Sequence, residues 1–149
     1  MAPALSIIEQ IRNAYSSAVV RECQETKKQK VKKGNLAPVL ILKGEHLAGD
    51  GRQACDCIFI YETEDKVYIL LVELKSRSLG NTIQQLKSCN QMRKFFLQGI
   101  KIQGKSIEVR FAWYSEGKNS MDMRRIKKAR IEDKVIQPKN FSEPIASIL

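Results

Sequence analysis

The sequence predicts a single α/β domain whose elements follow the order α-β-β-β-α-β. In two segments, apolar residues recur at three- and four-residue steps, the spacing of a helix with one buried face. Short apolar runs between polar or glycine-containing stretches lie among and after these segments, as expected of strands. The length of 149 residues suits one compact core, so residues 1–149 are taken as one domain.

The first half of the chain predicts one long helix and one short strand. The helix is expected over residues 5–29, where its apolar stripe begins at Ile7, and it ends in a lysine-rich run stopped by Gly34. A strand is expected at Val39–Leu42. The glycine-containing segment 44–53 is predicted to be a loop.

Two stronger strands and a second helix come next. Cys55–Tyr61 and Val67–Lys75 are joined by the polar segment 62–66, which is the pattern of a β-hairpin. Asn81 is a good N-cap residue for a helix that runs from Thr82 to about Gln98.

A last strand is expected at Ile107–Tyr114, where apolar residues alternate and Trp113 is predicted to lie in the core. The remainder, from Glu116 onward, is predicted to be a basic C-terminal appendage to the α-β-β-β-α-β core.

Charge indicates a polyanionic partner. Lys and Arg number 26 against 16 Asp and Glu, which gives a net charge of +10 and a pI near 9.6. Such an excess attracts nucleic acid first, with acidic membranes and acidic proteins behind it. Two basic clusters stand out, one with Lys30, Lys32 and Lys33, the other with Arg124 and Arg125. Each is either a phosphate contact or a solvated surface.

Location and thiol chemistry are predicted together. The chain shows no signal-peptide pattern and no apolar run of spanning length, so a cytoplasmic protein without a membrane partner is expected. In that setting Cys23, Cys55, Cys57 and Cys89 are expected to be reduced, packed thiols, because their spacing suits zinc poorly. Cys55 and Cys57 flank Asp56 and should both point away from it, toward a helix.

The predicted hairpin brings charged residues together. A turn centred on Glu64 and Asp65 places Asp56 opposite Glu73, with the two side chains on one face. Lys75 lies two residues beyond Glu73 and therefore points to the same face. A slip of one residue in the register would separate these groups.

These three groups suggest a metal centre. Facing carboxylates repel each other unless a divalent cation lies between them, and hard oxygen ligands select Mg²⁺ or Mn²⁺. Such a metal polarises a phosphate and activates a water, which a nearby lysine can orient. The alternative is a strand end that emerges into solvent, with Glu73 and Lys75 as a surface pair.

Asp56, followed after a hairpin by Glu73-Leu74-Lys75, resembles the motif of the PD-(D/E)xK nuclease superfamily, and the element order over residues 5–114 resembles that family's core. The resemblance implies a central mixed four-stranded sheet flanked by helices. It also implies that Asp56, Glu73 and the backbone carbonyl of Leu74 bind the metal. Lys75 would help to activate water.

The same resemblance implies further site residues and shows departures. Some members place a glutamine on the helix after the lysine strand, which is Gln85 or its neighbour Gln84 here, although the aromatic partner seen in one variant is missing. Members often add a glutamate from the first helix, a role open to Glu22 or Glu25, although each is otherwise read as a solvated helix residue. The motif's proline is replaced by Cys55.

Two residues outside the motif are weighed as substrate contacts. Arg77 follows the motif strand and is placed to touch a phosphate beside the scissile bond. His46, the single histidine, is either a ligand or a substrate contact, but a lone loop histidine more often has neither role.

The function expected from the sequence is a Mg²⁺- or Mn²⁺-dependent endonuclease acting on nucleic acid, with DNA preferred over RNA through the family's base rate. A homodimer would serve to cut two strands. One alternative is a non-catalytic nucleic-acid-binding module with a nuclease-like fold. Another is a basic adaptor that binds an acidic protein.

Overall fold

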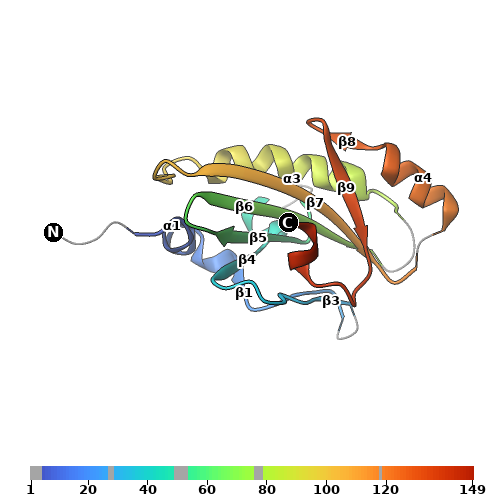
Figure 1. Ribbon diagram of the computed structural model, residues 1–149, viewed down its shortest axis with the longest axis horizontal. Coiled ribbons are helices and arrows are strands. Elements are labelled where there is room, and N and C mark those ends of the chain that lie inside the picture. Colours follow the sequence, from blue (N-terminus) through green and yellow to red (C-terminus); the bar gives the residue numbers. More distant parts are fainter. Residues whose placement is uncertain (1–4, 27–28, 49–53, 76–78, 118) are drawn as a thin grey trace.

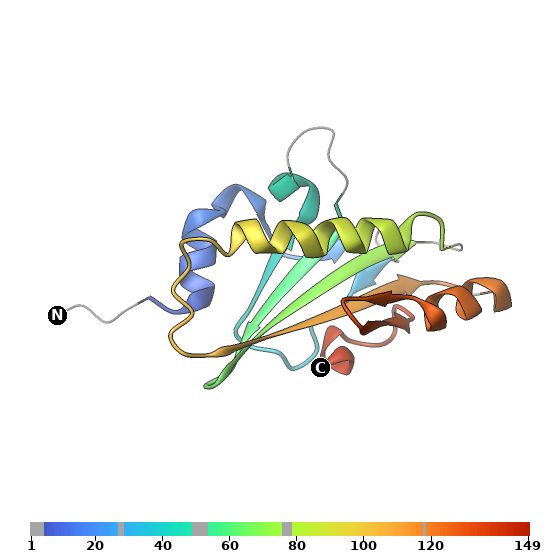
Figure 2. The ribbon, with the colours of Figure 1, turned by 90° about the horizontal axis from the view of Figure 1, so that it is seen from above.

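A computed structural model describes residues 5–26, 29–48, 54–75, 79–117 and 119–149, with only the backbone of residues 48 and 75. These residues form a large mixed sheet with helices against one face (Figures 1 and 2). The α/β class predicted from the sequence is therefore confirmed. In spatial order the strands are β1 (Val19–Val20), β4 (Val39–Lys43), β5 (Cys57–Glu62), β6 (Lys66–Lys75), β7 (Ser106–Ser115), β9 (Lys134–Lys139) and β8 (Arg130–Ile131).

The described residues place seven strands in this sheet, so the prediction of four was wrong in number. The four expected strands form its centre: β4, β5 and β6 are antiparallel neighbours, and β6 and β7 are parallel. The parallel pair is joined by α3 (Thr82–Phe96), as a parallel connection requires a crossover.

The basic C-terminal segment is part of the sheet and not an appendage. After α4 (Ser120–Lys128), β8 and β9 form a hairpin, and β9 pairs in parallel with β7. The pattern of β9 was weak because only Ile136 is a buried apolar residue in it and Pro138 interrupts it. The chain ends in a 3₁₀ helix, η2 (Ile145–Ile148).

The first helix is shorter than predicted. α1 spans Ile7–Ala14, capped by Ser6, whose side chain accepts a hydrogen bond from the N–H of Glu9. The 3₁₀ helix η1 (Ser16–Ala18) and strand β1 follow, and β1 pairs with β4. The two valines of β1 fit the helical spacing of apolar residues, but β-branched side chains suit a strand and the edge of β4 was open to them.

A small two-stranded arm follows β1. It consists of β2 (Cys23–Gln24) and β3 (Lys30–Val31), with Cys23 opposite Val31 and Gln24 opposite Lys30. The segment predicted to be a loop begins with a short helix, α2 (Gly44–Ala48).

The sheet buries both of its faces. Alternate residues of β6, namely Val67, Ile69 and Leu71, pack in the core beneath α1 and α3, while Leu70 and Val72 pack in a second core with the arm and η2. Figure 2 shows α1 and α3 on one side of the sheet and η2 on the other. Trp113 is fully buried in the first core, as predicted.

The cysteines form two disulfides, so the prediction of reduced thiols was wrong for this structure. Cys23 bonds to Cys57 and Cys55 bonds to Cys89. Cys55 and Cys57 were expected to point to the same side of the sheet, but they lie in opposite cores. A bend at Asp56 interrupts the alternation expected of a continuous strand. Spacing in the sequence carried no sign of these pairings.

Among the described residues, no helix has both the length and the apolar character needed to cross a membrane.

Candidate functional site

The hairpin register places Asp56 and Glu73 together. β5 and β6 pair from Cys57 opposite Val72 to Glu62 opposite Val67, the register that a turn centred on residues 64 and 65 predicts. One step beyond this ladder, the N–H of Asp56 donates a hydrogen bond to Oε1 of Glu73 at 3.1 Å. In return, the N–H of Leu74 donates to Oδ2 of Asp56 at 2.7 Å.

Each carboxylate is therefore fixed by the backbone of the opposite strand. Glu73 is only 1% exposed, so the alternative of a surface pair at a strand end is wrong for this residue. Burying a carboxylate costs free energy unless hydrogen bonds or a cation compensate. Buried carboxylates therefore occur mainly at functional sites or in structural ion-pair networks. Asp56 is partly exposed.

Lys75 is the last residue of β6. Its backbone pairs with Ser115 of β7, so Lys75 lies at the same end of the sheet as Glu73. Its side chain lies outside the described part of the structure. Arg77, predicted to contact a phosphate, also lies outside the described residues.

Gly44 holds the backbone of Asp56 in place. Its N–H donates to the carbonyl of Asp56 at 3.1 Å. A Cβ atom on Gly44 would lie 1.9 Å from the carbonyl oxygen of Cys55, so only glycine permits this approach.

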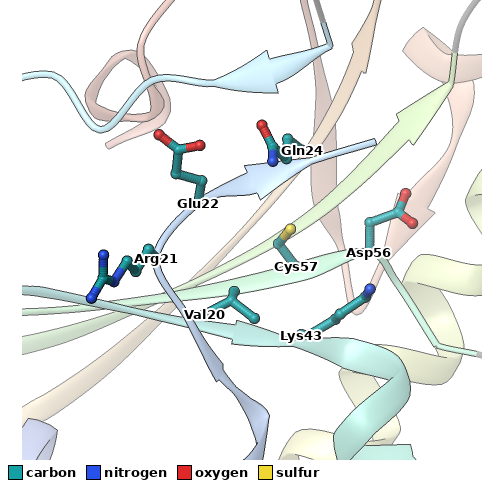
Figure 3. A pocket seen from close by; sticks show the side chains of 7 residues that line it. All are labelled: Val20, Arg21, Glu22, Gln24, Lys43, Asp56 and Cys57. Atoms are coloured by element: carbon teal, nitrogen blue, oxygen red, sulfur yellow. The ribbon is translucent and has the colours of Figure 1, made fainter. Parts of the chain in front are cut away.

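Asp56 opens onto a pocket of about 590 Å³. Its charged lining residues are Arg21, Glu22, Lys43 and Asp56, and Figure 3 shows the tip of Lys43 lying toward the Asp56 side chain. Lys43 ends β4 directly opposite Cys57, one residue from Asp56, which explains its place. Neither Lys43 nor Arg21 was predicted, because only the pairing of β4 with β5 and the end of α1 at Ala14 bring them here.

Of the two glutamates weighed for the first helix, Glu22 lines this pocket and Glu25 does not. Glu22 reaches it from the segment between β1 and β2, not from a helix, and forms an ion pair with Lys30 at 3.2 Å. His46 lies on α2, half-exposed and outside the pocket lining, with Nε2 3.8 Å from Glu45.

Gln85 lies on the face of α3 that turns toward the site. Cys89, one turn later, is bonded to Cys55, the neighbour of Asp56. The side-chain Oε1 of Gln85 and Oγ1 of Thr82 are buried and accept or donate no hydrogen bond among the described residues. Gln84 is exposed. Buried polar atoms without partners are uncommon, so this face has capacity for a water or a ligand atom.

Lys30, Lys32 and Lys33 line a second pocket of about 530 Å³ beside the first. Arg21 and Glu22 line both pockets, so the two are neighbours. Among the described residues, the second pocket is lined by four cationic residues and one carboxylate, whereas the charges that line the first are balanced.

The other basic cluster is anchored at the same end of the sheet. Arg124 and Arg125 are exposed on α4, whose first turn holds Asp122. Oδ2 of Asp122 accepts a hydrogen bond at 3.1 Å from the N–H of Leu79, four residues after β6 ends. Neither arginine lines the two pockets described above.

The donor groups at the site suit a hard cation. Among the described residues, no group of three His, Cys, Asp or Glu side chains is placed to hold a metal ion, so a closed zinc-type site is not formed there. Mg²⁺ keeps several waters and is usually bound through one or two carboxylates. The two adjacent carboxylates of Asp56 and Glu73 fit that pattern.

Comparison of the chain with models of known protein families, with curated proteins and with solved structures found no match.

Proposed function

We propose that the protein is a metal-dependent endonuclease that hydrolyses phosphodiester bonds in nucleic acid, DNA more readily than RNA. The observation that carries this proposal is the reciprocal pair of hydrogen bonds that fixes the buried Glu73 beside Asp56, which itself lines a pocket next to a basic one. A net charge of +10 supports a polyanionic substrate.

Membership of the PD-(D/E)xK superfamily is part of the proposal. The order α1-β4-β5-β6-α3-β7 and the mixed pairing of the four central strands agree with the core implied by the motif. The motif residues Asp56, Glu73 and Lys75 lie at one end of the two central strands.

Asp56, Glu73 and the carbonyl of Leu74 would hold Mg²⁺ or Mn²⁺. When bound, such an ion polarises the phosphate and makes a water more acidic. The chain's own groups do the remaining work. Leu74 and Asp56 use backbone N–H groups to orient the two carboxylates, so each presents a defined oxygen to the site.

Cationic side chains would bind the substrate phosphate. Lys43 lines the pocket beside Asp56, and its only ion pair among the described residues is with the exposed Glu45 at 3.1 Å. Exposed pairs of this kind contribute little, so a phosphate displaces the partner at small cost. Lys75 would orient the attacking water or stabilise developing charge, and Gln85 would hold a water on the α3 side.

Replacing Asp56 tests the proposal. Asp56→Asn removes one charge with almost no change in volume. Cleavage with saturating Mg²⁺ is expected to fall to background, while affinity for the same oligonucleotide in chelator is kept. Lys75→Ala is expected to slow cleavage by about 10²–10⁴-fold if it acts in proton transfer or charge stabilisation. The assay needs a panel of single-stranded, duplex and branched DNA, and RNA.

Asp65→Asn is the matched control, because it makes the same change in the exposed turn at the far end of the hairpin. It should cut like the parent protein. Full cleavage by Asp56→Asn would exclude the carboxylate from the reaction. No cleavage by the parent, with binding retained, would leave the non-catalytic nucleic-acid-binding module as the function.

A cytoplasmic location and a homodimer that cuts two strands complete the proposal. Disulfides are rare in the cytosol of mesophiles, so cell fractionation combined with a count of free thiols tests the location directly. Light scattering of the protein with and without substrate tests the dimer.

A further inference from the structure

We infer that the β2–β3 arm is a phosphate-binding wall that guides one polynucleotide strand to Asp56. This inference rests on the proposed function, and it adds the form of the substrate and the path that it takes. The occupant is a single strand held through its sugar–phosphate backbone.

The arm has one apolar side and one basic side. Cys23 and Val31 are buried in the second core, at 0% and 2% exposure, whereas Lys30 on the adjacent strand position is partly exposed. Lys32 and Lys33 continue the basic side, and both are exposed without an ion-pair partner among the described residues. Strand alternation turns Lys30 away from the buried side of Val31, and Lys32 and Lys33, which follow β3, line the same pocket as Lys30.

The row leads to the candidate catalytic pocket. The arm's pocket and the pocket of Asp56 share Arg21 and Glu22. A phosphate chain that follows the four cations of the arm's pocket therefore reaches Lys43 and Asp56 next. Among the described lining residues, the net charge along this path changes from strongly positive at the arm's pocket to balanced at the pocket of Asp56. A bound divalent cation would add positive charge there.

The arm is held firmly against the site. The Cys23–Cys57 disulfide joins it to the residue after Asp56. At its other end, the N–H of Ile145 donates to the carbonyl of Lys32 at 2.8 Å. A wall fixed at both ends before the substrate arrives loses little conformational entropy on binding.

The size and chemistry of the two pockets favour one strand. Volumes of about 590 and 530 Å³ are those of small-ligand sites, which is the scale of a few nucleotides of one strand. No aromatic side chain lines them in the part of the chain that the structure describes, so these residues offer bases no stacking platform. Contacts would be made to phosphates and would tolerate any sequence.

The test compares two double variants of equal charge. Lys32→Gln with Lys33→Gln alters the arm, and Lys66→Gln with Lys101→Gln alters the partly exposed Lys66 and the exposed Lys101 at the opposite, hairpin end of the sheet. Affinity for a fluorescent 12-nucleotide single DNA strand is measured in chelator over a salt series, with thermal unfolding as the check on folding.

The arm variant is expected to bind on the order of tenfold more weakly at low salt, with the slope of log affinity against log salt reduced by about 1.4, the value for two phosphate contacts on a single strand. The control variant should change affinity by less than about twofold through its distant charge alone. Equal losses in the two variants, or none in the arm variant, would overturn the inference.

Three further probes complete the test. A ribo-strand of the same length should lose affinity equally, and a loss confined to one sugar would overturn contact through phosphates. A loss seen with a duplex but not with the single strand would overturn the strand path. Polyglutamate that binds as tightly as the strand would assign the arm to an acidic protein. Because binding is read in chelator, failure of cleavage leaves this result intact.

Discussion

Gly44 determines where Asp56 can lie. Its N–H holds the carbonyl of Asp56, and its missing side chain lets the carbonyl of Cys55 approach to a distance that no Cβ atom allows. The candidate catalytic carboxylate is therefore positioned through the backbone of a neighbouring strand end, as well as through the N–H of Leu74.

Gly44→Ala is expected to push residues 54–56 away from β4 and to lower both stability and cleavage. The cost in free energy of unfolding should be about 1–3 kcal/mol, typical of overpacking a tight contact. Urea unfolding measures the first effect, and cleavage well below the unfolding transition measures the second. Gly117→Ala is the control, since a Cβ atom there meets nothing within 4 Å. If Gly44→Ala is destabilised but cleaves like the parent protein, the position that Gly44 gives to Asp56 is not required for activity.

At the scale of single residues, the sequence predicted the pairing of Asp56 with Glu73 because a polar turn between two strong strands fixes the register. Lys43 and Arg21 could not be predicted in the same way. Their place depends on how β4 and the chain after α1 meet β5, which are contacts between segments far apart in the sequence.

At the scale of elements, Glu62 connects the hairpin to α1. Its carboxylate, 8% exposed, accepts hydrogen bonds from the N–H groups of Ile7 and Ile8 and from Nζ of Lys105 at 2.7 Å. Burial raises the pKa of Glu62, but the Lys105 hydrogen bond and the two backbone hydrogen bonds outweigh it and hold the pKa below its ordinary value. The charge also suits the positive end of the helix.

Because the folded-state pKa of Glu62 is lowered, its contribution to stability is present above the unfolded-state pKa and is lost as pH falls through the folded-state pKa. Glu62→Gln is expected to cost about 1–3 kcal/mol near neutral pH and much less in acid, where the parent carboxyl is itself protonated. Urea unfolding at several pH values measures this difference. Glu108→Gln, in the more exposed pair with Arg110, should change stability little. An equal cost at all pH values would contradict the assignment.

Elements with a strong local pattern were predicted well, and those defined by their partners were not. α3, β6 and β7 have long runs with one periodicity, and their predicted bounds agree with the structure to within about two residues. β1, β2 and β3 have two residues each. β1 is defined by its pairing with β4, and β2 and β3 are defined by their pairing with each other. Asn81 precedes α3 as expected, but its side chain makes no capping hydrogen bond.

At the scale of the whole molecule, the two faces of the sheet are closed by different parts of the chain. Helices α1 and α3 close one face, and the arm with the C-terminal η2 closes the other. The Cys23–Cys57 disulfide ties the arm, and the Cys55–Cys89 disulfide ties α3, to the two residues that flank Asp56. Stability of the C-terminal segment is consequently part of the stability of the site.

Ile145→Ala tests whether the C-terminal segment belongs to the core. Ile145 is fully buried in the second core, and its N–H holds Lys32 of the arm. Removing its side chain is expected to cost about 2–5 kcal/mol, as for other buried isoleucines. The midpoint of urea unfolding should fall with an unchanged slope, because the same surface is exposed on unfolding.

Trp113 is the single tryptophan and is buried in the opposite core, so its fluorescence should follow the same transition as circular dichroism. Leu149→Ala, four residues later at a 43% exposed position, should leave the midpoint nearly unchanged. A midpoint that stays constant in Ile145→Ala, or a separate early transition not sensed by Trp113, would show that the segment is an appendage after all.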